Sequence, residues 1–351
     1  MLRTRVMIID DSIMFREFLS RALAKDASLE VVGAFADPLQ AMEQITALNP
    51  NVLAVDMEMP RMRGDEFLRI VLPKHPHLNA VVISALSKNV FDAMQAGAID
   101  FVSKPGSSPG YEKEHFIEEI IEKIKIAATA SLKRPAVGGY TRPQTAPIQP
   151  SVGRLNMGMV QSKNLIAIGA STGGTEAIIQ VIKDFPATTP AVVIVQHMPP
   201  VFTRLYAERL DKFIAMKVRE AKQGDRVERG TILIAPGGDQ QMRLRSDAQG
   251  YFISLSTEAK VNGHCPSVDI LFESVAQVAG PHALGVILTG MGADGARCLR
   301  QMRDKGAHTI GQDEESCIVY GMPKVAYDLG GVAEQLPLAA IGAAVLRRFS
   351  H

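Results

Sequence analysis

The chain has 351 residues, of which 46% are hydrophobic, and its formal net charge is +1. This length and apolar content are typical of two folded domains with ordinary cores. The near-zero net charge provides no attraction for nucleic acid or for an acidic membrane surface, and the absence of Trp argues against base stacking. We therefore expect no nucleic-acid partner.

The cysteines and the apolar runs indicate a reducing, aqueous compartment. The cysteines, at 265, 298 and 317, are odd in number and lack metal-site spacing. The N-terminus shows no signal-peptide pattern, and no apolar run approaches the roughly 18 residues that a membrane span needs. We expect a cytoplasmic protein without membrane insertion, in which Cys298 and Cys317 are small core residues.

Residues 1 to 130 alternate short apolar runs with amphipathic helical patterns. One helical pattern runs from Phe15 to Leu23, a second opens with Asp37-Pro38, and the last covers Phe116 to Ala130. This alternation predicts a doubly wound parallel sheet, whose functional edge lies at the carboxyl ends of the strands. The five predicted strands are Val6–Ile9, Glu30–Ala34, Val52–Val55, Ala80–Ile83 and Phe101–Val102.

Charged and polar side chains follow these strands at the predicted edge. Asp10 and Asp11 follow the first strand, and Asp56 follows the third. Carboxylates gathered at one edge repel one another unless a cation such as Mg²⁺ joins them, and a carboxylate beside Mg²⁺ can attack a phosphoryl group. Ser84 and Lys104 follow the fourth and fifth strands, where they could bind phosphoryl oxygens. The alternative interpretation is that these are unrelated residues at loop ends.

With these edge positions matched, residues 1 to 130 resemble the receiver domain of response regulators along their whole length. The resemblance implies a flavodoxin-like fold in which Asp56 is phosphorylated with a sensor histidine kinase as phosphodonor. The implied Mg²⁺ ligands are Asp10, Asp11, Asp56 and the main-chain carbonyl of Glu58, and the implied phosphoryl contacts are Ser84 and Lys104.

Two further positions matter for this resemblance. Phe101 matches the aromatic residue whose rotamer reports the phosphorylation state in receivers. Arg63 stands where the family usually has Asp, but the following Gly64 of the turn is kept. We therefore expect an altered surface charge at this turn rather than lost chemistry.

Residues 131 to 163 lack periodicity and are rich in Pro and Gly, which predicts a flexible or partly extended linker. Some thirty flexible residues span roughly 30 Å on average, which keeps the two halves at an effective concentration near the millimolar scale. Even a weak contact between the halves could then be populated and switched. Docking of the C-terminal part of this segment on the second domain is the alternative.

Residues 164 to 351 repeat the alternation, which predicts a second open, mostly parallel, Rossmann-like sheet with an inserted hairpin. The predicted strands are Leu165–Ile168, Ala191–Val195, Thr231–Ala235, Gln241–Leu244, Tyr251–Leu255, Leu284–Leu288 and Thr309–Ile310. The predicted helices cover Thr175–Lys183, Phe202–Leu210, Ser267–Val278 and Gly295–Lys305, a segment after Met322-Pro323 that ends at Gly330-Gly331, and a last stretch with Ile341 and Phe349.

A hydroxyl lies on a tight strand-to-helix turn in Gly169-Ala170-Ser171-Thr172-Gly173-Gly174. The Gly-x-Ser-x-Gly spacing is that of a nucleophile elbow, and the helix start supplies backbone N–H groups that can hold an anion. The alternative is an ordinary turn whose Ser or Thr caps the helix.

Two more chemical groups follow other predicted strands. His197 and Asp294 come after predicted strands, so that a parallel sheet would bring them to the edge that carries Ser171. A hydroxyl, an imidazole and a carboxylate are the nucleophile, general base and orienting acid of serine catalysis. N–H groups in the Gly-rich turns could bind the oxyanion. The alternatives are a polar loop end for His197 and a helix N-cap for Asp294.

Other histidines are weaker candidates. His264 lies near Ser267 and Asp269, but in a loop of Gly, Cys and Pro, and Ser267 is predicted to cap its helix. His282 and His308 fall at strand starts, which is the opposite edge. The pair Asp294 and His308 could imitate the Ser…Asp…His order of α/β-hydrolases, but His308 precedes its strand.

The second half resembles the catalytic domain of chemotaxis-specific protein-glutamate methylesterases. The resemblance implies a triad of Ser171, His197 and Asp294, with an oxyanion contact at Met291. It also implies removal of methyl groups from γ-glutamyl methyl esters on methyl-accepting chemoreceptors, deamidation of receptor glutamines, and no cofactor for the esterase reaction. The matching stretches are residues 168–174, 196–198, 235–238, 266–272, 288–295, 312–317 and 320–323.

The resemblance has one departure and leaves two other functions open. Cys298 stands where a Gly is usual, and we expect it to tighten the helix packing behind Asp294. A second hypothesis is a binding-only regulator that has lost catalysis. A third is a hydrolase for another ester or amide outside chemotaxis.

Overall fold

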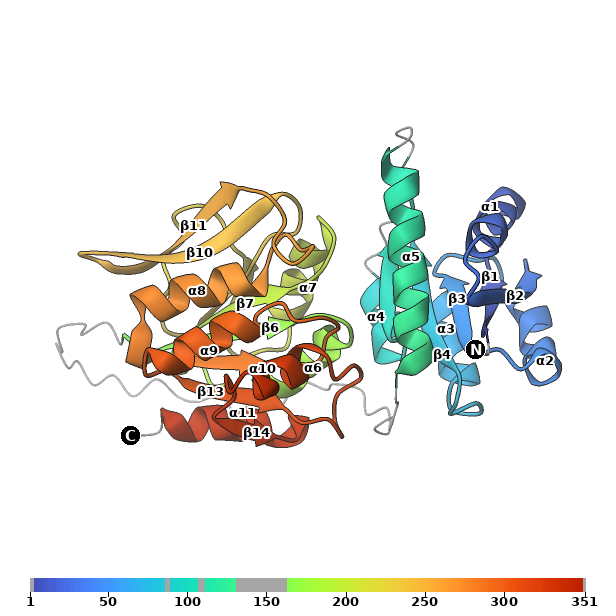
Figure 1. The fold of residues 1–351 in the computed structure, drawn as a ribbon. Coiled ribbons are helices and arrows are strands. Elements are labelled where there is room, and N and C mark those ends of the chain that lie inside the picture. The colour runs from blue at the N-terminus through green and yellow to red at the C-terminus, as the bar shows by residue number, and fades with distance from the viewer. Residues whose placement is uncertain (1–2, 86–88, 107–110, 131–162, 350–351) are drawn as a thin grey trace, which may run out of the picture.

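The computed structural model describes residues 3–85, 89–106, 111–130 and 163–349. These residues form two α/β units that lie side by side, one coloured blue to teal and the other green to red in Figure 1. The predicted linker falls outside the described residues except for Lys163. Within the described ranges, no helix has the length and apolar character needed to cross a bilayer.

The first unit is built on a five-stranded sheet with the order β2-β1-β3-β4-β5, and all of its neighbouring strands are parallel. The alternation predicts a doubly wound sheet, and this order is its flavodoxin-like form, which the resemblance to receiver domains implies. The strands are β1 (Thr4–Ile9), β2 (Leu29–Phe35), β3 (Val52–Asp56), β4 (Asn79–Ser84) and β5 (Asp100–Ser103).

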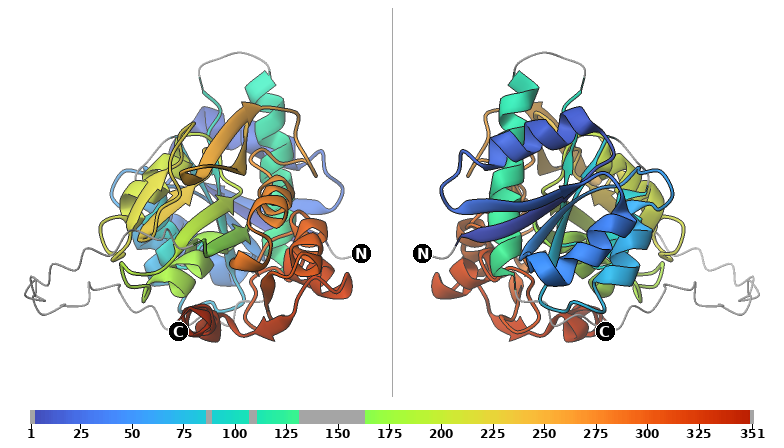
Figure 2. Two further views of the ribbon diagram at one scale, coloured as in Figure 1. Left: turned by 90° about the vertical axis from the view of Figure 1, so that its left-hand side faces the viewer. Right: turned by 90° about the vertical axis from the view of Figure 1, so that its right-hand side faces the viewer.

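Helices cover both faces of this sheet, as the right-hand view of Figure 2 shows. Apolar residues of α1 and α5 pack on one face, and those of α2, α3 and α4 pack on the other. Asp37 accepts a hydrogen bond from Leu39 N at the start of α2, with Pro38 in the first helical position, which confirms the predicted helix start. The helices are α1 (Ile13–Leu23), α2 (Pro38–Leu48), α3 (Gly64–Val71), α4 (Val90–Gln95) and α5 (Tyr111–Thr129).

The second unit is built on a seven-stranded parallel sheet with the order β14-β13-β12-β6-β7-β9-β8. Its central strands are buried on both faces, which explains their continuous apolar runs. The strands are β6 (Leu165–Ala170), β7 (Ala191–Gln196), β8 (Lys217–Glu220), β9 (Thr231–Ile234), β12 (Ala283–Ile287), β13 (His308–Gln312) and β14 (Glu334–Leu336).

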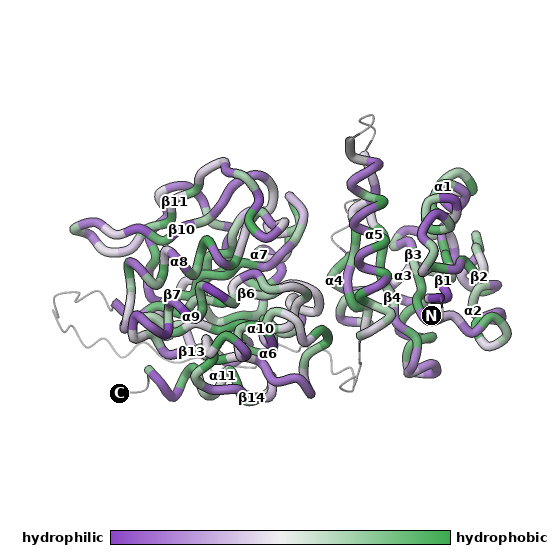
Figure 3. Tube along the Cα trace, viewed as in Figure 1, coloured by the Kyte–Doolittle hydropathy of each residue, from purple (hydrophilic) through white to green (hydrophobic). Residues whose placement is uncertain are grey.

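Three helices cover one face of the second sheet, and the opposite face carries the remaining helices and an antiparallel hairpin. The hydropathy colouring of Figure 3 shows green segments along the strands and inward helix faces and purple segments at the periphery. The first face carries α6 (Gly174–Ile182), α7 (Phe202–Leu210) and α11 (Leu338–Arg348). The other carries α8 (Val268–Val278), α9 (Ala296–Asp304), α10 (Met322–Asp328) and the hairpin of β10 (Gln240–Asp247) and β11 (Gly250–Thr257).

The two units share one apolar cluster. The ring of Phe101 in β5 lies 4.6 Å from the ring of Phe202 in α7, measured between centroids, and Phe91 in α4 lies 5.3 Å from Tyr206. Polar contacts surround this cluster. Arg209 Nη1 in α7 donates to Asp92 Oδ1 at 2.9 Å. The first unit therefore packs directly on α7 of the second.

The structure adds two strands that the sequence analysis did not predict. β8 has the sequence Lys-Val-Arg-Glu, and β14 has three residues with only partial burial. Both lie at the edges of the seven-stranded sheet, where one side of the strand has no neighbour and a continuous apolar run is not needed. The last helix of the first unit also begins at Tyr111, earlier than the predicted Phe116.

Candidate active site and phosphoacceptor site

Ser171 lies directly after β6, on the turn that leads into α6. Its N–H donates to Thr289 O at 3.0 Å, and its carbonyl accepts from Gln196 Nε2 at 2.8 Å. A Cβ atom added at Gly290 would lie 2.7 Å from the Ser171 Cβ, so this position has no room for a side chain. The carboxyl ends of three strands therefore meet around the serine.

His197 lies directly after β7, and its N–H donates to Ala170 O at 3.2 Å. Its ring is largely covered, with 9% of the side chain exposed, and its Nε2 lies 2.9 Å from Asp294 Oδ2. The other ring nitrogen, Nδ1, is buried and has no hydrogen-bond partner among the described residues. A proton on Nε2 would therefore satisfy the carboxylate and leave the Nδ1 lone pair available.

The hydroxyl of Ser171 is not hydrogen-bonded to His197 Nδ1 in this structure. The two residues are nevertheless neighbours, because Gln196 bonds to the Ser171 carbonyl and His197 bonds to Ala170. Such nucleophile-to-base contacts are often long without substrate and tighten when the substrate binds.

Asp294 is buried at the N-terminus of α8 and accepts hydrogen bonds from several elements. Asn262 Nδ2 donates at 2.9 Å, Ser267 Oγ at 2.7 Å and Val268 N at 2.6 Å. Burial opposes its charge, but the hydrogen bonds from His197, Asn262 and Ser267 outweigh this and hold the pKa of Asp294 well below its usual range. The carboxylate is therefore ionised and able to orient the imidazole.

One prediction is wrong at this position. Ser267 does occupy the N-cap position of α8, but its hydroxyl makes no capping hydrogen bond and donates to Asp294 instead. The carboxylate of Asp294 accepts from the free N–H groups of Val268 and Asp269. The helix start is thus satisfied by a residue from a distant loop.

Two residues complete the surroundings of this edge. Met291 follows Gly290 and is 46% exposed, so it lies on the rim beside Ser171. The ring of His264 stacks on the ring of His197, with centroids 3.7 Å apart and planes at 13°. Its loop has no regular pattern in the sequence, so the sequence alone does not indicate this position of His264. By contrast, His308 pairs with Glu334 at the start of β13, on the opposite edge, as predicted.

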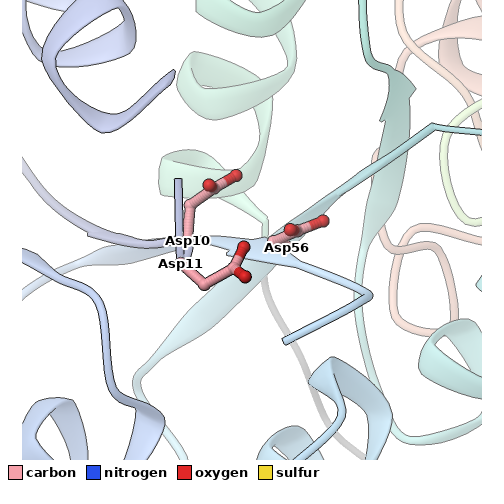
Figure 4. Close-up of side chains that lie close together, drawn as sticks. All are labelled: Asp10, Asp11 and Asp56. Atoms are coloured by element: carbon pink, nitrogen blue, oxygen red, sulfur yellow. The ribbon is translucent and has the colours of Figure 1, made fainter. Parts of the chain in front are cut away.

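The second cluster lies at the carboxyl edge of the first sheet and is shown in Figure 4. Asp10, Asp11 and Asp56 each offer a carboxylate oxygen, and these oxygens lie within 4.8 Å of one another. Lys104 Nζ lies 2.8 Å from Oδ2 of both Asp10 and Asp56. Ser84 is buried, and its carbonyl accepts from Lys104 N at 2.7 Å. The structure therefore brings these sequence-predicted residues together.

The charge balance of this cluster fits a divalent cation. One ammonium faces three carboxylates, and burial raises the pKa of Asp56 despite the hydrogen bond from Lys104. The ion pairs with Asp10 and Asp56 raise the pKa of Lys104 against the effect of burial. Oxygen ligands with excess negative charge are those that Mg²⁺ prefers. Glu58, whose carbonyl the resemblance adds, is exposed two residues after Asp56.

Comparison with known proteins covers both units. The family model described as CheB methylesterase matches residues 166–345, and that of the response regulator receiver domain matches residues 6–111. A protein of Syntrophomonas wolfei named protein-glutamate methylesterase/protein-glutamine glutaminase 2 is 51% identical, over 98% of this chain and 97% of its own. The chain belongs to the CheB methylesterase family.

Two further similarities support the CheB methylesterase assignment. A protein-glutamate methylesterase/protein-glutamine glutaminase of Syntrophotalea carbinolica is 45% identical, over 99% of this chain and 98% of its own. The crystal structure of the Thermotoga maritima CheB methylesterase catalytic domain superposes with a TM-score of 0.51 and 35% identity, covering 53% of this chain and 98% of that one. The matched part of this CheB methylesterase contains Ser171, His197 and Asp294.

Proposed function

We propose that this chain is a phosphorylation-activated protein-glutamate methylesterase. It hydrolyses γ-glutamyl methyl esters on chemoreceptors to glutamate and methanol, and it also deamidates receptor glutamines. The observation that carries the proposal is the 2.9 Å pairing of His197 with Asp294 beside the Ser171 turn. We assign residues 1–130 to a receiver domain, 131–163 to a linker and 164–351 to the catalytic domain.

The hydrolytic step uses a serine, a base and an orienting acid. Ser171 Oγ attacks the ester carbonyl while its proton passes to His197 Nδ1, the ring nitrogen without a partner among the described residues. His197 then gives this proton to the leaving methoxide, so that methanol departs and an acyl-serine remains. Water attacks the acyl-serine, loses its proton to His197 and releases glutamate, and the proton returns to Ser171. Asp294 holds the Nε2–H throughout.

The oxyanion that forms at the ester carbonyl needs hydrogen-bond donors. We assign this role to the main chain at Met291, which lies on the rim beside Ser171. Loss of one oxyanion donor typically raises the barrier by about 2.7–4 kcal/mol. When the substrate is a glutamine, ammonia takes the place of methanol as the leaving group, and the residues keep their roles.

Phosphorylation takes place at Asp56, whose carboxylate oxygen bonds to the phosphorus while the bond from the phosphorus to the donor breaks. Asp10, Asp11, Asp56 and the carbonyl of Glu58 would hold Mg²⁺, which when bound offsets the negative charge of the carboxylates and of the phosphoryl oxygens. Ser84 and Lys104 contact the phosphoryl oxygens. The phosphodonor is a sensor kinase, and no cofactor takes part in ester hydrolysis.

The receiver restrains the esterase through the contacts between the two units. Thr172, the residue after the nucleophile, is buried and donates through Oγ1 to Asp100 Oδ2 at 2.8 Å. Phosphate on Asp56 draws in Ser84 and changes the position of Phe101, whose ring lies against Phe202. This weakens the contact and opens the approach to Ser171.

The test measures methanol release from methylated receptor by the full chain, with and without acetyl phosphate and Mg²⁺. We expect stimulation by the phosphodonor, no release by Ser171→Ala, and unstimulated release by Asp56→Asn. Demethylation by Ser171→Ala would overturn the esterase mechanism. Intact stimulation of Asp56→Asn would overturn only the switch.

A fluorophosphonate probe separates this proposal from a binding-only regulator. Covalent labelling at Ser171 is expected for a serine hydrolase, and an unlabelled serine would favour the regulator that has lost catalysis.

A further inference from the structure

We propose that His264 is a positioning residue for the general base, because its ring stacks on His197 and fixes the plane of that imidazole. This inference rests on the proposed function of the same site. The two rings lie nearly parallel, at 13°, with centroids 3.7 Å apart. In this role, His264 acts on the reaction through His197.

The imidazole of His197 needs such a support. Its ring is held by one side-chain hydrogen bond, from Nε2 to Asp294, while Nδ1 has no partner among the described residues. The χ2 torsion of histidine has a broad energy minimum, so a ring held at one nitrogen can rotate and carry the other nitrogen away from the serine. A flat ring stacked against its face restricts this rotation.

The loop that carries His264 is fixed by several hydrogen bonds. Val261 and His264 exchange backbone hydrogen bonds of 3.0 and 2.9 Å. Gln241, from the hairpin, donates to His264 O at 3.3 Å and accepts from Ser267 N at 2.8 Å. The loop can therefore hold the ring of His264 at a defined position.

The same loop reaches the orienting acid. Asn262 Nδ2 donates to Asp294 Oδ1 at 2.9 Å and to Asp269 Oδ2 at 2.9 Å. One short segment thus contacts both His197 and Asp294, the two groups whose relative geometry decides the position of Nδ1.

The protonation state of His264 suits this role. Burial, followed by repulsion from His197, lowers the pKa of His264 to about 4, so the ring is neutral at pH 7. A neutral aromatic face is compatible with the positive charge that His197 acquires when it accepts the serine proton, whereas a second imidazolium at this distance would oppose it. His264 therefore adds no charge of its own beside His197.

The experiment uses the full chain with acetyl phosphate and Mg²⁺, and it compares His264→Ala, His264→Leu and His264→Phe with the unchanged protein. Two rates are measured: methanol release from methylated receptor and labelling of Ser171 by a fluorophosphonate. Small displacements of a reacting group reduce rates strongly, so we expect about a tenfold or greater loss of kcat for Ala and Leu, with KM unchanged within about twofold. Phe keeps a flat ring and restores most of kcat.

Leu and Phe together separate stacking from filling of space. If Ala fails to fold, these two larger residues still decide the question, because only one of them has a planar face. Equal kcat for Leu and Phe, an unchanged kcat in all variants, or a loss confined to KM would each overturn the role of His264. His282→Ala is the matched control, since His282 lies at the opposite edge of the sheet.

Reference variants separate failure of this inference from failure of the proposed function. His197→Ala should abolish both methanol release and labelling. If it leaves them intact, the proposed mechanism is wrong. If His197→Ala abolishes methanol release and labelling while His264→Leu has the rates of the unchanged protein, only the positioning role of His264 is wrong.

Discussion

Asp294 accepts five hydrogen bonds on one carboxylate, from His197, Asn262, Ser267, Val268 and Asp269. Two of these donors are backbone N–H groups at the start of α8, where a negative charge is stabilised by the free N–H groups and by the helix dipole. Asp294 therefore connects the general base His197 to the start of α8. A substitution here should affect stability and turnover together.

We expect Asp294→Asn to lower kcat by about 10³- to 10⁴-fold, because an amide no longer orients the imidazole as the carboxylate does. It should also lower the melting temperature at pH 7. The pKa of Asp294 is depressed in the folded state, so its contribution to stability is present above the unfolded pKa and is lost as the pH falls through the folded pKa.

Methanol release and thermal unfolding between pH 3 and pH 7 measure the two effects. Asp304→Asn, at an exposed residue that pairs with Arg300, is the matched control. A variant that unfolds with the pH dependence of the unchanged protein would contradict this account of Asp294.

Val201 is a second residue with its own consequence. It precedes α7 with φ at +75°, a region that a β-branched residue adopts with strain. The residue is 38% exposed, so little packing is lost when the side chain is removed. We expect Val201→Gly to raise stability by about 1 kcal/mol after allowance for the backbone entropy of glycine, which corresponds to roughly 2–4 °C in melting temperature. Calorimetry tests this, and a lower melting temperature would show that the backbone is unstrained here.

At the scale of elements, α7 connects the two sites. It begins a few residues after His197 and presents Phe202, Tyr206 and Arg209 to the receiver. Arg209 contacts both Asp92 and Gln95 of α4. The helix is thus part of the esterase unit, and its outer face forms the contact with the receiver.

Removing one contact of α7 should loosen the restraint. We expect Arg209→Ala to raise the unphosphorylated rate of methanol release by about 2- to 5-fold, which matches the roughly 0.5–1 kcal/mol of a partly exposed ion pair. The phosphorylated rate should stay the same. Arg204→Ala is the control on the same helix, because Arg204 pairs with Glu208 of its own helix. An equal rise in the unphosphorylated rate for Arg209→Ala and Arg204→Ala would show that the Arg209 contact does not restrain the esterase.

Continuous apolar runs predicted the central strands of both sheets, because strands that are buried on both faces need a continuous hydrophobic sequence. The same reasoning missed β8 and β14, which lie at the sheet edges and have no buried residue apart from Val218. It also set His264 aside, since stacking on His197 depends on the path of an irregular loop. The contact of α4 with α7 joins surfaces far apart in sequence, and no local pattern indicates it.

For the whole molecule, the charge on the buried Asp56 carboxylate affects the stability of the folded chain. Burial raises the pKa of its carboxylate, so the folded protein loses stability as the pH rises from the unfolded pKa through the folded one. At neutral pH, the folded protein should therefore be more stable with an uncharged side chain at this position.

We expect Asp56→Asn to raise the melting temperature at pH 7 without Mg²⁺ by a few degrees, and to abolish stimulation by acetyl phosphate. Added Mg²⁺ should stabilise the unchanged protein more than this variant, because the variant lacks one of the carboxylates. Differential scanning calorimetry with and without Mg²⁺ measures both effects. Destabilisation of Asp56→Asn at pH 7 would contradict the charge balance described for this cluster.

The hydrogen bond from Thr172 to Asp100 lies next to the nucleophile, yet neither side chain carries out a chemical step. Its strength can change by substitution without loss of either reaction. A weaker bond would raise the rate of ester hydrolysis by the unphosphorylated protein and reduce the fold increase on phosphorylation. A stronger bond would have the opposite effects. Evolution could in this way adjust the speed of sensory adaptation through two residues, with the kinase and the receptors left as they are.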